Sequence, residues 1–91
     1  NFEILYVPGH TPGELSVLLN LPETGSILLT SDAISRDTEI AEGCLDAHNP
    51  TQAIEGAHRI LELARQRDAW IIYGHGPAQW NELKKAPYIY K

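Results

Sequence analysis

The chain has 91 residues, of which 43% are hydrophobic, and its 12 acidic and 7 basic side chains give a formal charge of −5. This length fits one small domain, and the hydrophobic fraction is typical of globular proteins rather than of disordered tails. The negative charge argues against nucleic acid or an anionic membrane as a partner, because both attract clusters of Lys and Arg.

The cysteine content and the apolar runs limit the compartment in which the protein works. The single cysteine, Cys44, cannot form an internal disulfide, which favours a reducing, cytoplasmic location. No apolar run approaches the roughly 20 residues that a membrane helix needs. The chain opens at Asn1 with a strand-like segment and no initiator Met, a start expected for the middle of a longer gene product.

Three β-rich runs occupy the first third of the chain. Residues 2–7 are rich in β-formers and are stopped by Pro8 and Gly9, which predicts a strand that runs into a turn. Residues 15–19 and 27–30 are apolar and are separated by the turn sequence Pro-Glu-Thr-Gly, so a hairpin is expected. Their nearly continuous apolar character predicts strands that are covered on both faces.

The rest of the chain predicts two helices and one more strand. The apolar residues of the segment 33–48 follow neither a helical nor a strand period, so this segment is expected to form an irregular surface region. Asn49-Pro50 then predicts a capped helix over about 50–67, with an apolar stripe at Ile54, Ala57, Leu61 and Ala64. Residues 68–73 predict a buried strand, and a short helix is expected over 80–84. This order indicates an α/β or α+β half-layer whose sheet lacks a partner.

Three residues with metal-binding side chains each follow an apolar strand. They are His10, Asp32 and His75. Ligands collect at strand ends in α/β sheets, and imidazole and carboxylate are ligands that hydrolytic zinc prefers. Each residue alone is more typical of a turn or cap, but the combination predicts that the three groups converge at one edge of the sheet and bind metal.

The motifs around these residues resemble a known family. The segments Val-Pro-Gly-His-Thr-Pro-Gly at 7–13, Ile-Leu-Leu-Thr-Ser-Asp-Ala at 27–33 and Ile-Tyr-Gly-His-Gly at 72–76 resemble the C-terminal half of the metallo-β-lactamase superfamily. Within it, the chain looks most like the N-acyl homoserine lactonases and related lactone hydrolases, which are quorum-quenching enzymes. The resemblance covers essentially all 91 residues and implies that residues 1–91 form the C-terminal half of an αββα sandwich.

The resemblance also implies a role for each site residue. His10 would bind a first metal ion, Asp32 would bridge two ions, and His75 would bind the second. Two zinc ions, or other divalent transition metals, would lower the pKa of a shared water, and the resulting hydroxide would attack the carbonyl of a lactone or similar ester. Thr11 and Ser16 would support these ligands through hydrogen bonds, with ordinary turn and strand hydroxyls as the alternative.

Two departures from the family pattern qualify this interpretation. The family's first metal motif, of the type H-x-H-x-D-H, is absent, so the N-terminal half of the fold is the expected partner and the chain alone is expected to be a poor hydrolase. Many homoserine lactonases also have a tyrosine three residues after the bridging aspartate, where Ser35 stands here. Ser35 is the candidate catalytic residue at that position, although its side chain is too short for the same contact.

Several alternatives stay open at this point. The substitution at Ser35 leaves room for a glyoxalase II-like thioesterase. An inactive binding module with the same fold, a self-sufficient α/β interaction domain and a homodimer are further hypotheses. Metal content and the positions of His10, Asp32 and His75 distinguish among them.

Overall fold

The computed structural model describes residues 1–91 as one four-stranded sheet with flanking helices. The elements follow in the order β1 (Phe2–Tyr6), β2 (Leu15–Leu21), β3 (Gly25–Leu29), the 3-10 turn η1 (Ser31–Ala33), α1 (Glu39–Glu42), α2 (Pro50–Arg67), β4 (Trp70–Ile72) and α3 (Pro77–Glu82). None of the helices combines the length and the apolar character needed to cross a bilayer.

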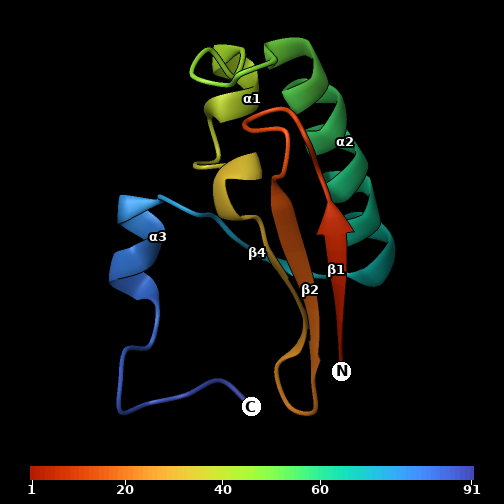
Figure 1. The fold of residues 1–91 in the computed structure, drawn as a ribbon. Coiled ribbons are helices and arrows are strands. Elements are labelled where there is room, and N and C mark those ends of the chain that lie inside the picture. The colour runs from red at the N-terminus through yellow and green to blue at the C-terminus, as the bar shows by residue number, and fades with distance from the viewer.

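The sheet has the strand order β1-β2-β3-β4. β1, β2 and β3 form an antiparallel meander, which confirms the predicted hairpin, and β4 then pairs with β3 in parallel after the crossover through α2 (Figure 1). β1, β3 and β4 therefore run in one direction and end at the same edge of the sheet. The loops that leave these strands carry the three candidate ligands.

Helix α2 confirms the predicted range 50–67. The side chain of Asn49 accepts a hydrogen bond from the Gln52 N–H at 3.1 Å, and proline occupies the first turn. The buried face is rotated from the predicted stripe, because Ile60 is buried whereas Ile54 is only half-buried. The rotation follows from Gly56, whose missing side chain lets the helix pack closely on Val7 of the sheet.

The two faces of the sheet have different surroundings. One face, with Leu5, Leu18 and Leu28, packs against α2 and forms the core. The register places on the other face an almost entirely apolar set: Phe2, Ile4, Tyr6, Leu15, Val17, Leu19, Leu21, Ile27, Leu29, Trp70 and Ile72. We call this set the open face. The β1–β2 part of the open face is uncovered, so the prediction of strands covered on both faces is wrong for the chain by itself.

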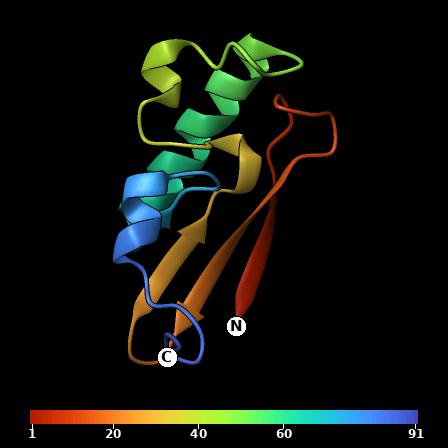
Figure 2. The same ribbon diagram turned by 90° about the vertical axis from the view of Figure 1, so that its left-hand side faces the viewer.

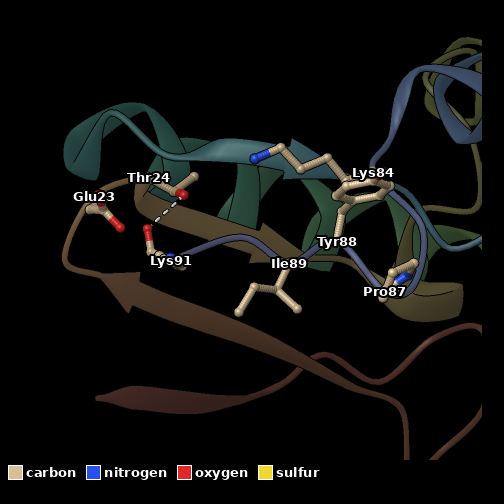
Figure 3. A pocket seen from close by; sticks show the side chains of 7 residues that line it. All are labelled: Glu23, Thr24, Lys84, Pro87, Tyr88, Ile89 and Lys91. Atoms are coloured by element: carbon tan, nitrogen blue, oxygen red, sulfur yellow. Dashed lines mark hydrogen bonds between the residues drawn. The ribbon is translucent and has the colours of Figure 1, made fainter.

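The C-terminal segment covers only the β3–β4 part of the open face (Figures 1 and 2). The rings of Trp70 and Tyr90 contact each other edge to face, with 5.3 Å between their centroids. Ile27 is covered in this part of the face and is only 2% exposed. The carbonyl oxygen of Lys91 accepts hydrogen bonds from the backbone and side chain of Thr24 in the β2–β3 turn (Figure 3). A cavity of about 560 Å³ lies between this tail and the turn, and none of the candidate ligands lines it.

Two other predictions need correction. The segment 33–48, predicted to be irregular surface, contains α1 and buries Ile34, Glu39 and Cys44, because it packs across the end of the core. The last helix begins at Pro77 rather than at residue 80, since proline is well suited to the first turn, and it ends at Glu82.

Candidate functional site

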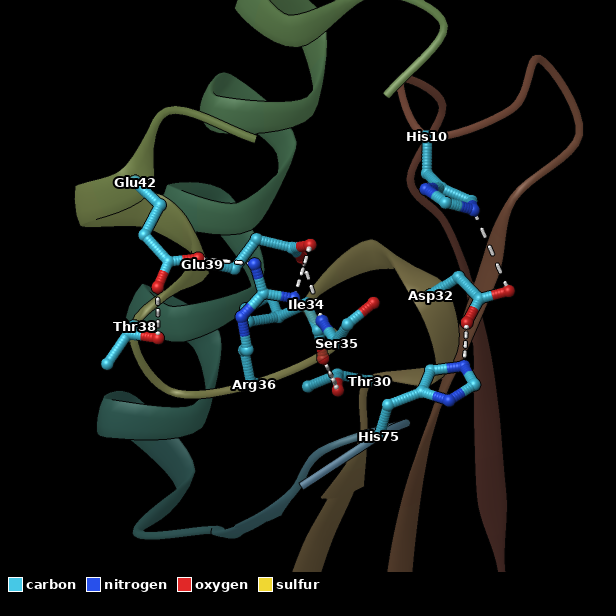
Figure 4. Close-up of polar contacts among 10 residues, drawn as sticks. All are labelled: His10, Thr30, Asp32, Ile34, Ser35, Arg36, Thr38, Glu39, Glu42 and His75. Carbon is cyan, nitrogen blue, oxygen red and sulfur yellow. Dashed lines mark hydrogen bonds and ion pairs between the residues drawn. The ribbon is translucent and has the colours of Figure 1, made fainter. Parts of the chain in front are cut away.

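The three candidate ligands meet at one edge of the sheet, as the sequence predicted. The Nε2 atom of His75 lies 2.7 Å from Oδ1 of Asp32, and the Nε2 atom of His10 lies 3.7 Å from Oδ2 of the same carboxylate. Figure 4 shows the two imidazoles approaching Asp32 from different loops. The side chains are 28%, 40% and 69% exposed for His10, Asp32 and His75, so the group is open to solvent and to ligands.

The loop of His10 is held by the beginning of α2. The Asn49 N–H donates to the carbonyl oxygen of Gly9 at 2.8 Å, and the His48 N–H donates to that of His10 at 3.0 Å. Gly9 has φ 146° and lies so close to Ala53 that a side chain would overlap the helix backbone. His48 and Asn49 thus bind the loop through their backbone N–H groups, and the start of the helix fixes the position of His10.

Asp32 lies in the turn η1, and two buried hydroxyl groups form hydrogen bonds with the backbone next to this turn. Thr30 is fully buried, and its hydroxyl donates to the carbonyl oxygen of Ile34 at 2.6 Å. The Ser16 hydroxyl donates to the carbonyl oxygen of Thr30 at 2.9 Å. Ser16 therefore contacts the backbone two residues before Asp32 and makes no contact with a ligand side chain. The supporting role of Ser16 stays a prediction, and the hydrogen bond to Thr30 is the contact through which it would act.

The loop of His75 is bound to the loop of Asp32 through the main chain. The His75 N–H donates to the carbonyl oxygen of Ser35 at 2.7 Å, and the Gly74 N–H donates to that of Ile34 at 3.4 Å. A side chain at Gly74 would overlap the carbonyl group of Ser31. Only glycine allows this approach, which brings His75 within reach of Asp32.

The side chain of Glu39 supports the site in a way that the sequence did not reveal. It is 7% exposed, and its Oε1 accepts a hydrogen bond of 2.8 Å from the Ser35 N–H. Glu39 thereby fixes the Ile34–Ser35 peptide unit, whose carbonyl oxygen accepts from the N–H of Gly74, the residue before His75. Its charged neighbours Arg36 and Glu42 gave it the pattern of a surface residue, and no signal in the sequence marks it as buried.

Ser35 and Thr11 lie near the ligands, but their hydroxyls form no hydrogen bonds within the chain. Ser35 is buried and contributes its backbone, whereas Thr11 is exposed and uses its carbonyl oxygen to accept from the Gly9 N–H at 3.1 Å. The catalytic role of Ser35 and the supporting role of Thr11 stay predictions.

A cluster of charged side chains around Arg36 lies behind the site. Arg36 donates to the Glu42 carboxylate, and this hydrogen bond, together with one from Thr38, lowers the pKa of Glu42. Burial raises the pKa of the Tyr73 hydroxyl, and the nearby charge of Asp37 adds to the effect. Glu39 and Glu42 pair with Arg36, and Asp32 is the acid that faces the two histidines.

The donor set fits a carboxylate shared between two metal ions better than a single ion. His10 and His75 approach different oxygens of Asp32. Within this chain alone, no group of three or more His, Cys, Asp or Glu side chains could hold a metal ion. Tetrahedral zinc with bonds of about 2.1 Å holds two donor atoms about 3.4 Å apart. The His10 distance is close to this value, whereas the exposed His75 ring, now hydrogen-bonded to Asp32, would have to move slightly outward.

The chain is similar in sequence to N-acyl homoserine lactonases. It is 32% identical over 88 residues to AttM of Rhizobium radiobacter and 29% identical over 86 residues to AiiA of Bacillus thuringiensis subsp. kurstaki. These alignments cover 94% and 93% of this chain but only 34% of each relative. The chain thus spans about one third of the length of the curated relatives that it matches, and the matching third is their C-terminal part. No family model matches the chain.

Solved structures show the same relationship. An N-acyl homoserine lactone hydrolase with N-hexanoyl-L-homoserine bound at its catalytic metal centre superimposes with a TM-score of 0.88 and 27% identity, over 96% of this chain and 35% of that structure. The dizinc quorum-quenching lactonase AidC gives a TM-score of 0.70 at 21% identity, over 94% of this chain and 31% of its own, which supports the fold alone.

Proposed function

Because this chain is a homologue of the C-terminal third of N-acyl homoserine lactonases, within the metallo-β-lactamase superfamily, we propose that it supplies part of a metal-dependent lactonase active site. The complete protein, meaning the polypeptide that joins this chain to a region matching the rest of the relatives, would hydrolyse a lactone or a similar ester. Residues 1–91 would form the C-terminal half of its αββα sandwich.

The observation that carries this proposal is the sharing of the Asp32 carboxylate by two histidines. Each oxygen of Asp32 faces a different imidazole, which suits a carboxylate that bridges two cations. His10 would then bind one ion and His75 the other. Zinc is the preferred assignment, since neutral imidazole and carboxylate are its usual ligands at hydrolytic sites.

The three candidate ligands define what this chain contributes to the chemistry. When bound, the two ions polarise the carbonyl group under attack and make a water acidic enough to act as a nucleophile near neutral pH. Asp32 would contribute its two carboxylate oxygens to the ions, and His10 and His75 would each contribute an imidazole nitrogen. The carbonyl oxygen of Ser35 orients the backbone of His75 by accepting a hydrogen bond from its N–H.

The open face supports a partner on the opposite side of the sheet. Phe2, Ile4 and Tyr6 of β1 are 60%, 62% and 62% exposed, although such side chains are normally buried in a folded domain. In the complete protein, the second sheet of the sandwich would cover them and bring the ligands that this chain lacks. A homodimer formed through the same face is the alternative.

A cytoplasmic location is also part of the proposal, and the free, buried thiol of Cys44 agrees with it.

Metal analysis and lactone hydrolysis of the complete protein test the proposal. We expect about two zinc ions per polypeptide and hydrolysis of an N-acyl homoserine lactone to the ring-opened acid. Asp32→Asn is expected to reduce hydrolysis by more than about 100-fold. Removing a residue that is only hydrogen-bonded to a metal ligand costs about 10- to 100-fold, and removing a ligand shared by two ions should cost more. Asp46→Asn, at an exposed residue that is not a candidate ligand, is the matched control.

The outcomes distinguish the remaining alternatives. A metal-free protein that hydrolyses nothing would indicate an inactive binding module. A zinc protein that cleaves thioesters of hydroxy acids and leaves lactones intact would support the glyoxalase II-like alternative.

A further inference from the structure

Strand β4 lies at the edge of the sheet, and the loop that carries His75 follows it directly (Figure 1). The inner side of β4 is paired with β3 and the turn after it, where the carbonyl oxygen of Ile72 accepts from the Thr30 N–H at 3.0 Å. Successive residues of a strand point their backbone groups to alternate sides. The Ile71 carbonyl and the Tyr73 N–H thus point to the outer side, beyond which the sheet has no further strand.

The side chain of Gln79, on helix α3, occupies both of these outer positions. Its Oε1 atom accepts from the Tyr73 N–H at 2.9 Å, and its Nε2 atom donates to the carbonyl oxygen of Ile71 at 2.7 Å. One amide thus pairs with the free edge of β4 as a residue of another strand would. Because Tyr73 precedes His75 and Gln79 follows it, the amide closes a loop over residues 73–79 that contains His75.

Hydrogen bonds rather than side-chain packing fix the shape of this loop. A cavity of about 390 Å³ lies beside it, with His75 and Gln79 among the lining residues, so side chains do not fill the space next to the loop. No residue of α3 is buried. On the inner side, the N–H groups of Gly74 and His75 donate to the segment after η1. On the outer side, the amide of Gln79 provides the corresponding support.

The imidazole of His75 depends on this backbone for its position. The side chain is 69% exposed, and the hydrogen bond to Asp32 is the one that its ring forms within the chain. A ligand that is already held in place loses little conformational freedom when it binds an ion, and its affinity for the ion is higher for that reason. Contacts that hold the loop should therefore strengthen the binding of metal by His75.

We propose that Gln79 is a positioning residue for His75. By closing the loop over residues 73–79, its amide holds the imidazole ready for a zinc ion and so raises the affinity of the site for the ion that His75 binds. The inference rests on the proposed function, because it takes His75 as a metal ligand. Gln79 forms its hydrogen bonds with β4 and with no candidate ligand, so it acts through the backbone of the loop and should spare the ion assigned to His10.

Zinc titration of the complete protein, with a chelator as competitor, tests this inference. Gln79→Met keeps a side chain of similar length and loses both hydrogen bonds. We expect it to weaken the binding of one of the two zinc ions by about tenfold, at the lower end of the effect of residues that support metal ligands. The affinity for the other ion should change by less than about threefold, which is small beside that effect. Gln79→Leu, a second variant without an amide, should give the same result.

Gln66→Met is the matched control, because it makes the same change at an exposed position of α2. It should leave the affinities for both ions unchanged. The two variants at Gln79 are expected to fold, since no residue of α3 is buried.

A second titration, in the His75→Ala variant, separates positioning of His75 from a general structural role. Once the imidazole is absent, adding Gln79→Met should change the affinity for the remaining ion by less than about threefold, because the effect of Gln79 passes through His75. A general structural role would weaken zinc binding by the same factor with and without the imidazole.

The inference is wrong if Gln79→Met leaves both zinc affinities unchanged, or if its effect persists in the His75→Ala variant. The proposed function stands in either case, provided that the unmodified protein binds two zinc ions and hydrolyses a lactone. An unmodified protein that binds no zinc refutes the proposed function, and the role of Gln79 with it.

Discussion

The backbone N–H of His75 donates a hydrogen bond of 2.7 Å to the carbonyl oxygen of Ser35. Because Ser35 lies three residues after Asp32, this bond joins the loop after β4 to the loop after β3, and it places an imidazole and a carboxylate in contact although 43 positions separate them in the chain. The geometry of the candidate site is thus built into the backbone, and substitutions that disturb the backbone should disturb the site.

Gly74→Ala is expected to damage the site without changing any candidate ligand. The new Cβ would overlap the carbonyl group of Ser31, so either η1 or the His75 loop must move. We expect the complete protein to lose about 1–3 kcal/mol of stability, as in other overpacked sites, and to bind less zinc. Thermal unfolding and metal analysis measure the two effects.

Gly13→Ala is the matched control for this substitution. No atom lies within 4 Å of a Cβ built at Gly13, so its stability should change by less than about 0.5 kcal/mol. Equal zinc contents in the two variants would refute the idea that the close approach of Gly74 to Ser31 positions His75.

Glu39→Ala is expected to loosen the loop after η1, because it removes the side chain that accepts a hydrogen bond from the Ser35 N–H. The substitution leaves the buried N–H of Ser35 without its acceptor, at a cost of about 1–3 kcal/mol. Glu39→Gln keeps an oxygen acceptor and should restore most of the stability and zinc affinity. Glu42→Ala, which removes an exposed carboxylate bound to Arg36, should have little effect on zinc affinity. A Gln variant as weak in zinc binding as the Ala variant would show that the charge of Glu39, rather than its hydrogen bond, matters.

Ile4→Asp tests the proposed partner of the open face. In the complete protein this substitution would bury a carboxylate against the second sheet, and we expect a loss of more than about 2 kcal/mol in the free energy of unfolding. Glu55→Asn, on the exposed side of α2, is the control. A concentration-dependent dimer that Ile4→Asp dissociates, with no loss of monomer stability, would instead identify a second copy of the chain as the partner.

The parts of the fold that the sequence predicted have strong local signals. Asn49-Pro50 determines where α2 begins because an amide side chain caps the helix and proline fits its first turn. The Pro-Glu-Thr-Gly turn determines the β2–β3 hairpin. The convergence of His10, Asp32 and His75 was predictable because each directly follows a strand, and the three strands end at one edge.

The parts that the sequence did not predict depend on tertiary contacts. The buried face of α2 is set by the contact of Gly56 with Val7, which periodicity cannot show. Glu39 becomes buried only because its carboxylate meets the Ser35 N–H. The occupied amide of Gln79 and the cavity beside it exist only when α3 lies next to β4.

Cys44 provides a pH-dependent test of how tightly the segment 33–48 packs. Its side chain is 3% exposed, and burial, with a smaller contribution from the Glu39 charge, raises the pKa of the thiol. The unfolded chain therefore releases this proton at lower pH than the folded chain does. The associated stability is present below the ordinary thiol pKa of about 8.5 and is lost as the pH rises through the folded pKa.

We expect the thiol of the folded protein to react slowly with an alkylating reagent at pH 8.5 and rapidly after denaturation. Cys44→Ser should remove this part of the loss of stability at alkaline pH, measured by urea unfolding between pH 7 and 10, although the burial of Tyr73, whose pKa is also raised, leaves a second decrease at higher pH. A thiol that reacts equally fast in the folded and unfolded protein would mean that α1 and the turn after it open readily, and that Glu39 does not hold the Ser35 peptide unit in solution.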